Sequence, residues 1–330
     1  MRAGRRRGRA PLPGGRHRYG APVSDPARRP HELEAIELLS SLVGPPAGDE
    51  VWIGDDCAVL GPASARVLFA TDLAAENVHF DRCHGTLADA GWRVLVQNLS
   101  DIAAMGGRPR AAVVAVAGAD LDELAAIYEG LLEASRRFDC PVVGGDLSDS
   151  AVLNIAVAIL GETAGSAPVL RRGAGPGETI YVTGPLGGAA AGLRELRADP
   201  STVSPCVTAF LRPQPRLAEG AAAAAAGAAA MIDISDGLGI DLWRLAAASR
   251  VGVELDDLPV AAGATPDEAL GGGEDYELVF TVADPGRLEQ VFTARGLRAP
   301  VRLGRTTADR AAFHLRGEDL EVAGFEHRLG

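Results

Sequence analysis

The chain has 330 residues, of which 47% are hydrophobic and 23% are charged, a composition typical of a soluble globular protein with room for two cores. Its net charge is −12, but residues 1–30 carry nine arginines against Asp25 alone, a charge of +8, so the rest of the chain carries −20. An acidic body disfavours nucleic acid as a partner, unless the basic residues 1–30 alone bind it. All 32 basic residues are arginine, which excludes a Walker A loop, a Schiff-base lysine and a lysine general base.

Residues 1–30 are rich in Arg, Pro and Gly and lack apolar periodicity, which predicts a basic disordered extension rather than an export signal or a transit peptide. The longest weakly polar run, "AAAAAAGAAAMI", is too short to span a bilayer, so no membrane association is expected. The four cysteines form no C-x-x-C pair, which disfavours zinc and disulfides and favours a cytoplasmic location. They are Cys57, Cys83, Cys140 and Cys206.

Helical and strand periodicities alternate from residue 31 onward. In the first half they predict helices over 32–44, 86–107 and 121–138, and strands over 66–73, 111–118 and 152–162. In the second half they predict strands over 179–184, 231–235, 251–258, 275–283 and 299–306, and helices over 187–197, 218–229, 238–249 and 284–296. Because "RRGAGPGE" between the halves has the composition of a hinge, we expect an α/β chain divided into domains 31–165 and 166–330.

The stretch "VTGPLGGAAAGL" joins a strand, a glycine-rich loop and a helix N-terminus, an arrangement that suits an anion such as phosphate. On its own this is weak evidence, because glycine-rich turns precede many helices. A dinucleotide-binding Rossmann fold is disfavoured, since no acidic ribose-binding residue is evident ~20 residues further on.

Aspartates recur where strands end or where an apolar helix should not contain them. They are Asp55 and Asp56 after Gly54, Asp72 at the end of "VLFATD", Asp101 inside an apolar helix, Asp146 after "VVGG", and Asp233 and Asp236 in "IDISDGLG". Any single one could be a surface or capping residue, and Asp236 could cap the helix that follows it. Carboxylates that converge raise one another's pKa unless cations neutralise them. Oxygen ligands without His or Cys indicate Mg²⁺, which usually accompanies phosphates.

Seven motifs occur in a specific order: "GDDCAVL", "TDLAAENVHF", "NLSDIAAMGGRP", "GGD", "RRGAGPGETIYVTGPLGGAAAGL", "IDISDGL" and "GGEDYELVF". This set, from about residue 31 to the C-terminus, resembles the thiamine-monophosphate kinases, a family of the aminoimidazole-ribonucleotide synthetase superfamily. The resemblance implies a two-domain α/β (α+β) fold with an N-terminal mixed sheet that pairs across a homodimer, near which the nucleotide binds. It also implies a C-terminal α/β domain that completes the site, and transfer of the γ-phosphate of ATP to thiamine monophosphate with several Mg²⁺ ions.

The resemblance also implies roles for individual residues. The metal ligands would be Asp56, Thr71, Asp72, Asp101, Asp146, Asp233 and Asp236; ATP would contact Gly145, Arg171 and Ser235; and the thiamine substrate would contact His79, Glu274 and Phe325. The sequence departs from the family at Ala70, where a serine is frequent, which puts one metal site in doubt if the serine hydroxyl is the ligand. Taken singly, His79 could be a surface histidine, Glu274 a solvated loop acid and Phe325 a packing residue.

The acceptor implied by the resemblance is a phosphate monoester, which is largely dianionic at neutral pH because its second pKa is ~6. Such a nucleophile requires no general base, and none is assigned. Catalysis would then rest on metal neutralisation and in-line positioning of the two substrates. Two alternatives remain open: another ATP-using enzyme of the same superfamily, and a non-catalytic regulator that binds Mg²⁺ and nucleotide.

Overall fold

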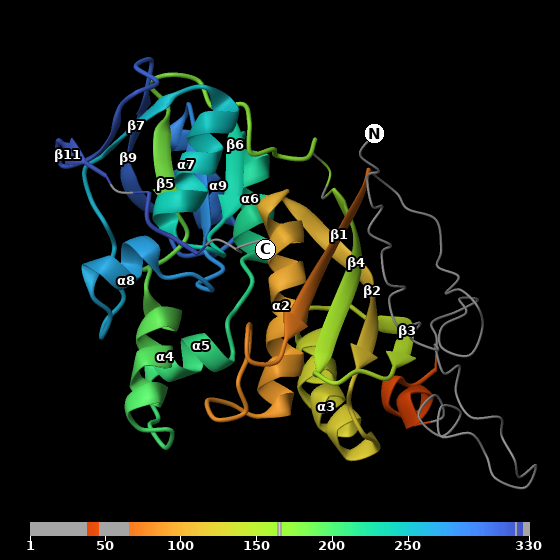
Figure 1. The fold of residues 1–330 in the computed structure, drawn as a ribbon. Helices are drawn as coiled ribbons and strands as arrows, with labels where there is room; N and C mark the ends of the chain where they lie inside the picture. Colours follow the sequence, from red (N-terminus) through yellow and green to blue (C-terminus); the bar gives the residue numbers. More distant parts are fainter. Residues whose placement is uncertain (1–37, 46–65, 164, 166, 321, 326–330) are drawn as a thin grey trace, which may run out of the picture.

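Two β-sheets with helices packed against them make up the molecule (Figure 1). The structure is a computed structural model, and it describes residues 38–45, 66–163, 165, 167–320 and 322–325. Residues 38–43 are helical, which confirms the described part of the helix expected over 32–44. The predicted ligand Asp56 and the basic extension lie outside the described residues.

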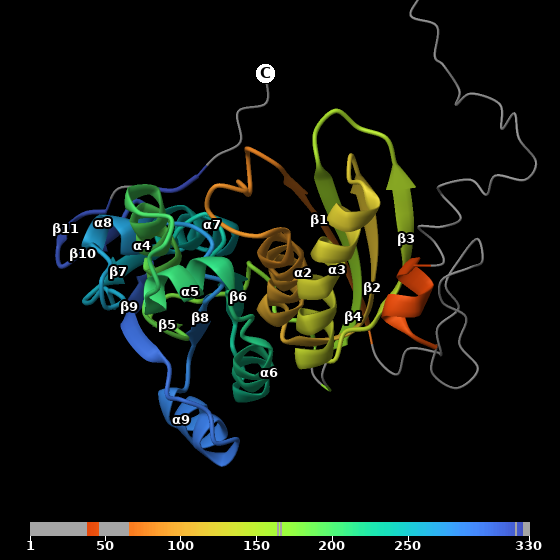
Figure 2. The same cartoon turned by 90° about the horizontal axis from the view of Figure 1, so that it is seen from below.

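The first sheet has four strands in the order β1-β4-β2-β3. β4 pairs antiparallel with both β1 and β2, whereas β3 pairs parallel with β2 at the far edge. Two helices, α2 and α3, cover one face of this sheet (Figure 2). The bounds are β1 Val67–Ala75, α2 Leu87–Ala104, β2 Gly107–Ala117, α3 Leu121–Arg137, β3 Val142–Ser148 and β4 Asn154–Thr163.

The face of this sheet that α2 and α3 do not cover is apolar. Along β1 the side chains alternate, so that Leu68 and Ala74 are buried while Phe69 and Leu73 are 73% and 50% exposed. The strand register places Val113 of β2 on the same face as Phe69. Period-two alternation is the signal of a half-buried strand. An apolar sheet face of this kind normally packs against another layer.

Helices α2 and α3 run antiparallel and approach each other through glycines. A Cβ atom built on Gly91 would lie 2.0 Å from the carbonyl oxygen of Ile127, and one on Gly130 would lie 1.7 Å from the carbonyl oxygen of Ala88. Neither neighbour can yield, because both are helix backbone. The close crossing holds α2, which carries Asp101, firmly against the first core.

We expect Gly130→Ala to lower the free energy of unfolding by about 2–3 kcal/mol, because the added methyl group forces the two helix backbones apart. In an open helix the same change would raise stability by up to ~1 kcal/mol. Gly286→Ala, in the exposed first turn of α9 (Pro285–Ala294), is the matched control and should be neutral or stabilising. Urea unfolding measures both; equal stability of Gly130→Ala and the parent protein would contradict the packing argument.

The second sheet has seven strands in the order β11-β10-β7-β9-β5-β8-β6, and all its pairs are antiparallel except β10 with β7. Its strands are β5 Thr179–Val182, β6 Ala230–Asp233, β7 Gly252–Leu255, β8 Leu278–Val282, β9 Val301–Thr307, β10 Phe313–Leu315 and β11 Glu318–Asp319. The other helices are α4 Gly188–Ala198, α5 Pro205–Leu211, α6 Leu217–Ala226, α7 Leu238–Ser249 and α8 Pro266–Gly271. Within the described chain, none of the helices combines the length and the apolar character needed to cross a bilayer.

Helices α4 and α5 form a hairpin with a small core of its own, made of Ala189, Leu196, Val207 and Phe210. Helix α5 is not among the helices predicted from the sequence, although the local signals are present. The Ser204 side chain accepts a hydrogen bond from the Val207 amide, and Pro205 stands in the first turn, where its missing N–H has no consequence.

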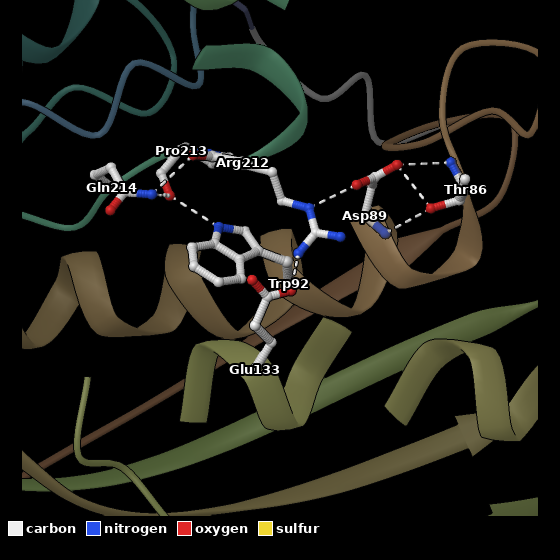
Figure 3. Close-up of polar contacts among 7 residues, drawn as sticks. All are labelled: Thr86, Asp89, Trp92, Glu133, Arg212, Pro213 and Gln214. Carbon is white, nitrogen blue, oxygen red and sulfur yellow. Dashed lines mark hydrogen bonds and ion pairs between the residues drawn. The ribbon is translucent and has the colours of Figure 1, made fainter. Parts of the chain in front are cut away.

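A clamp joins the end of α5 to the two helices of the first sheet (Figure 3). The Arg212 guanidinium donates to Asp89 of α2 at 2.6 Å and to Glu133 of α3 at 2.6 Å, and it lies 5.2 Å above the Trp92 ring. The indole N–H of Trp92 donates to the Pro213 carbonyl at 2.9 Å. Charged, aromatic and backbone groups thus fix the α5–α6 connection to α2.

Candidate active site

A cavity of about 920 Å³ opens between the two sheets. Its walls come from β1 and the loop that follows it, from α2, from the α4–α5 hairpin and from the turns after β6 and before β8. Nine of the residues singled out from the sequence line it: Thr71, Asp72, His79, Asp101, Asp233, Ser235, Asp236, Glu274 and Phe325. Segments far apart in the sequence therefore meet at one place.

Three carboxylates that line this cavity interact with one another: Asp72 from β1, Asp101 from α2 and Asp233 from the end of β6. Burial, with repulsion from Asp233 and Asp72, raises the pKa of Asp101 to about 8. Burial also raises the pKa of Asp233 to about 6, although the Ser100 hydroxyl donates to its carboxylate at 2.7 Å. The pKa of Asp72 is raised by burial, and its carboxyl shares a hydrogen bond with Asp101.

A second cavity of about 330 Å³ lies on the other side of this carboxylate cluster. Asp101 and Asp233 line both cavities, and Arg171 lines only the smaller one. The rest of the smaller cavity is mainly apolar, with Phe69, Met105 and Met231 among its walls. The carboxylates thus stand where a group bound in one cavity would meet a group bound in the other.

The chemistry of the cluster suits a hard cation such as Mg²⁺, because buried carboxylates that repel one another are neutralised by a metal. The described residues do not complete a metal site, since no group of three or more His, Cys, Asp or Glu among them is arranged to hold one. Asp56 lies outside them. The Thr71 hydroxyl is engaged with the Val157 carbonyl at 2.9 Å.

Two predicted residues stand apart from the cluster. Gly145 and Asp146 lie within β3, at the opposite edge of the first sheet from β1. The register aligns Asp146 with Leu73 across the two intervening strands, so Asp146 faces outward and lies about 14 Å from β1 at ~4.8 Å per strand. A single chain does not bring Asp146 to Asp72.

The turn after β6 is organised by Asp241, which the sequence analysis missed. The Asp241 carboxylate, buried in the first turn of α7, accepts hydrogen bonds from the amides of Ser235, Asp236 and Gly237 at 2.9–3.2 Å. Arg244 donates to both Asp241 and Asp236. In the sequence, Asp241 is an acid five residues after Asp236. Such an acid is equally typical of a surface position on an amphipathic helix, so the sequence did not indicate its role.

The loop before β8 brings Glu274 into the cavity. Glu274 pairs with Arg93 of α2, whose guanidinium lies 4.3 Å from the centre of the Phe210 ring. The loop returns to the turn after β6, since the Glu274 amide donates to the Ser235 carbonyl at 2.8 Å. Glu274 is therefore a partnered, half-buried carboxylate rather than a solvated loop acid.

His79, in the loop after β1, and Phe325, near the end of the described chain, both line the cavity. The Nδ1 atom of His79 accepts a hydrogen bond from the Ala75 amide at 3.0 Å. The Phe325 amide donates to the Asp236 carbonyl at 3.0 Å, and its side chain is 52% exposed. Phe325 is thus tied by its backbone to the turn after β6, and it lines the cavity.

Comparison with known proteins gives consistent results. Two family models match: the AIR synthase related protein N-terminal domain over residues 54–163 and its C-terminal domain over residues 175–315. The thiamine-monophosphate kinase of Mycobacterium tuberculosis is 36% identical over 288 residues, covering 82% of this chain and 86% of the relative.

Solved structures agree with the sequence comparison. The crystal structure of thiamine-monophosphate kinase from Stenotrophomonas maltophilia has a TM-score of 0.75 and 30% identity, covering 87% of this chain and 96% of that chain. A structure of AaThiL complexed with AMPPCP and TMP has a TM-score of 0.72 and 30% identity, covering 90% of this chain and 97% of that chain.

These matches define the class of fold as that of the AIR synthase related proteins, with two domains that combine mixed sheets and helices. The chain belongs to the thiamine-monophosphate kinase family, and it is an enzyme of the kinase class. The resemblance inferred from the seven motifs and the two-domain α/β (α+β) fold are thereby confirmed.

Proposed function

We propose that this enzyme transfers the γ-phosphate of ATP to thiamine monophosphate, giving thiamine diphosphate, by direct in-line transfer assisted by Mg²⁺. The observation that carries the proposal is the carboxylate cluster of Asp72, Asp101 and Asp233, which stands between two cavities. The names of the relatives, and a similar structure that holds AMPPCP and TMP together, support this choice of substrates. We place the boundary between the two domains near residue 165. We also place the enzyme in the cytoplasm, where the cysteines among the described residues, all free thiols, would stay reduced.

Each side of the cluster has a role in this proposal. Arg171, which lines the smaller cavity, and Ser235, which lines the larger one on the turn after β6, would contact ATP. The larger cavity would hold the acceptor, with Glu274, His79 and Phe325 around its thiamine portion. Aromatic rings and carboxylates together suit a cationic aromatic ligand.

No residue needs to act as a general base, because the acceptor phosphate is already largely dianionic at neutral pH. The chain's own residues bind and orient the two substrates and exclude water between them. Asp72, Asp101, Asp233 and Asp236, with Asp56, would hold Mg²⁺, which when bound offsets the repulsion between the two phosphate groups.

The test is incubation of the full-length protein with ATP, Mg²⁺ and thiamine monophosphate, followed by chromatographic separation of thiamine phosphates. Thiamine diphosphate should accumulate only when all three are present. Binding of ATP without any product would instead favour the regulator, and consumption of ATP only with a different acceptor would favour another enzyme of the superfamily.

We also propose that the enzyme is a homodimer in which the apolar outer faces of the two first sheets pair. Phe69, Leu73 and Val113 would be covered in such a dimer. The position of Asp146 supports it, because this predicted ligand lies on the outer face at the edge opposite Asp72. A second copy could bring Asp146 of the partner subunit to the site that one chain leaves without it.

Co-expression of Asp101→Asn with Asp146→Asn tests the dimer proposal. Each variant alone should be inactive, whereas the mixture should recover about a quarter of the parent activity, because half of the dimers are mixed and each has one complete site. If each site were built from a single chain, no mixed dimer would contain a complete site, and no recovery would be seen. Full activity of Asp146→Asn alone would show that Asp146 is not part of the active site.

A further inference from the structure

Asp275 occupies the N-terminus of α4, the feature that the sequence analysis associated with a bound anion. Its Oδ2 atom accepts a hydrogen bond from the Gly187 amide at 2.6 Å, and its Oδ1 atom accepts one from the Ala189 amide at 3.1 Å. Gly187, the residue before the helix, has no side chain with which to cap it. The N–H groups that were expected to hold a phosphate are therefore satisfied by a carboxylate of this chain.

The carboxylate of Asp275 is held in a largely enclosed position. Burial raises its pKa to about 6, although hydrogen bonds from the amides of Gly187 and Ala189 favour the charged form. At neutral pH the side chain is therefore mainly ionised, as an acceptor of two N–H groups must be. This differs from the solvated loop acid that the sequence alone would allow.

The residues on either side of Asp275 have an unusual backbone conformation. Glu274 and Tyr276 have φ angles of 66° and 50°, in the left-handed region that non-glycine residues rarely adopt. Such conformations persist only where surrounding contacts impose them, and they concentrate at functional sites. Contacts with the rest of the molecule must therefore hold this loop in its conformation.

Each side chain of this loop is directed to a different part of the molecule. Glu274 pairs with Arg93 of α2, and Tyr276 is buried in the core of the first sheet. Glu277 pairs with Arg216 at the start of α6. Among the described hydrogen bonds of residues 274–277, those of Asp275 reach the N-terminus of α4. Ala189, Ala190 and Leu193 of α4 line the large cavity.

We propose that Asp275 is a positioning residue for the acceptor: it ties the loop that carries Glu274 to the N-terminus of α4 and so sets the width of the acceptor side of the cavity. This inference rests on the proposed function. Asp275 itself does not line the cavity and acts through Glu274 and through the α4 wall. The three carboxylates of the cluster come from β1, α2 and β6 rather than from this loop or from α4.

The test compares Asp275→Asn and Asp275→Ala with the parent enzyme. An asparagine keeps one acceptor but turns an NH₂ group toward a helix N–H, and an alanine keeps none. We expect the KM for thiamine monophosphate to rise about tenfold in Asp275→Asn and further in Asp275→Ala, because the buried amides lose their partner. The KM for ATP should stay within about twofold of the parent value, since Arg171 and the carboxylates of the cluster lie outside this loop and outside α4.

Asp267→Asn is the matched control, because Asp267 is an exposed acid in the first turn of the neighbouring helix α8. Both of its KM values should equal those of the parent enzyme. Melting temperatures of all variants show whether a change in KM merely follows a loss of folded protein. If Asp275→Ala fails to fold, the KM values of Asp275→Asn still test the inference.

The inference is overturned if the KM for thiamine monophosphate is unchanged in Asp275→Asn, or if both KM values rise together with a loss of folded protein. A parent enzyme that forms no thiamine diphosphate would instead refute the proposed function. In that case calorimetric titration with thiamine monophosphate decides the inference separately: weaker binding by Asp275→Asn than by the parent supports it, and equal binding or none refutes it.

Discussion

Asp101→Asn should abolish phosphoryl transfer while making the metal-free protein more stable. The pKa of Asp101 is raised to about 8 by burial and by the neighbouring carboxylates, so at neutral pH this group opposes folding. The folded-state pKa lies above the unfolded value of 3.8, and the penalty applies once the pH exceeds that unfolded value. A neutral amide removes the penalty, and we expect a gain of about 1–3 kcal/mol in the free energy of unfolding.

The loss of activity has the same origin as the gain in stability. A carboxylate that repels its neighbours without a metal becomes a ligand when the metal is present. We expect kcat to fall by about a thousandfold or more in Asp101→Asn, since an electrostatic contribution of this size is typical of phosphoryl transfer. Addition of Mg²⁺ should raise the melting temperature of the parent enzyme more than that of the variant.

Asp122→Asn is the control for this experiment, because Asp122 is an exposed acid in the first turn of α3 and does not line the cavity. It should leave both turnover and melting temperature unchanged. Near-normal turnover of Asp101→Asn at ordinary Mg²⁺ concentrations would contradict the role given to the cluster. A lower melting temperature of the metal-free variant would contradict the electrostatic account.

Arg216→Met should cause the largest loss of stability that a single substitution near the site produces. Arg216 donates to both carboxylate oxygens of Glu277, at 2.9 and 2.5 Å, and Glu277 is only 4% exposed. Removal of Arg216 leaves the buried Glu277 charge without a counter-ion, with the Thr183 hydroxyl as its remaining donor, and loss of one partner costs about 3–5 kcal/mol in comparable pairs. Because the Arg216 side chain is 32% exposed, we expect about 3 kcal/mol, measured by urea unfolding.

Two comparisons isolate the unpaired charge as the cause. The double variant Arg216→Met/Glu277→Gln should recover most of the lost stability, because the buried group is then neutral. Arg305→Met, which removes one partner of the exposed pair with Glu254, should change stability by no more than about 1 kcal/mol. A double variant no more stable than Arg216→Met would show that lost packing, rather than charge, is responsible.

The sequence was informative where a residue contradicts its local environment. An aspartate inside the apolar helix that became α2 has no local explanation, and Asp101 indeed meets Asp72 and Asp233 at the cavity. The motif order was equally informative, since it identified nine residues that line one cavity. Helices with clear periodicity and caps, such as α3, were also predictable, because Asp120 and Glu123 form a capping box there.

The sequence was uninformative where a residue is ordinary for its position. Asp241 and Asp275 look like surface acids, and only the folded backbone shows that each accepts several amide hydrogen bonds. Asp72 was expected at a strand end but lies in the middle of β1, because apolar residues continue to Ala75. The separation of Asp146 from the cluster follows from strand order, which local patterns do not encode.

The central claim is that this enzyme joins the γ-phosphate of ATP to the phosphate of thiamine monophosphate. ³¹P nuclear magnetic resonance of a reaction with both substrates and Mg²⁺ tests this directly, because it observes every phosphorus atom at once. We predict that the γ-phosphate signal of ATP declines while the signals of thiamine diphosphate and ADP grow in equal amounts. Growth of inorganic phosphate and ADP without thiamine diphosphate, or an unchanged spectrum, would contradict the claim.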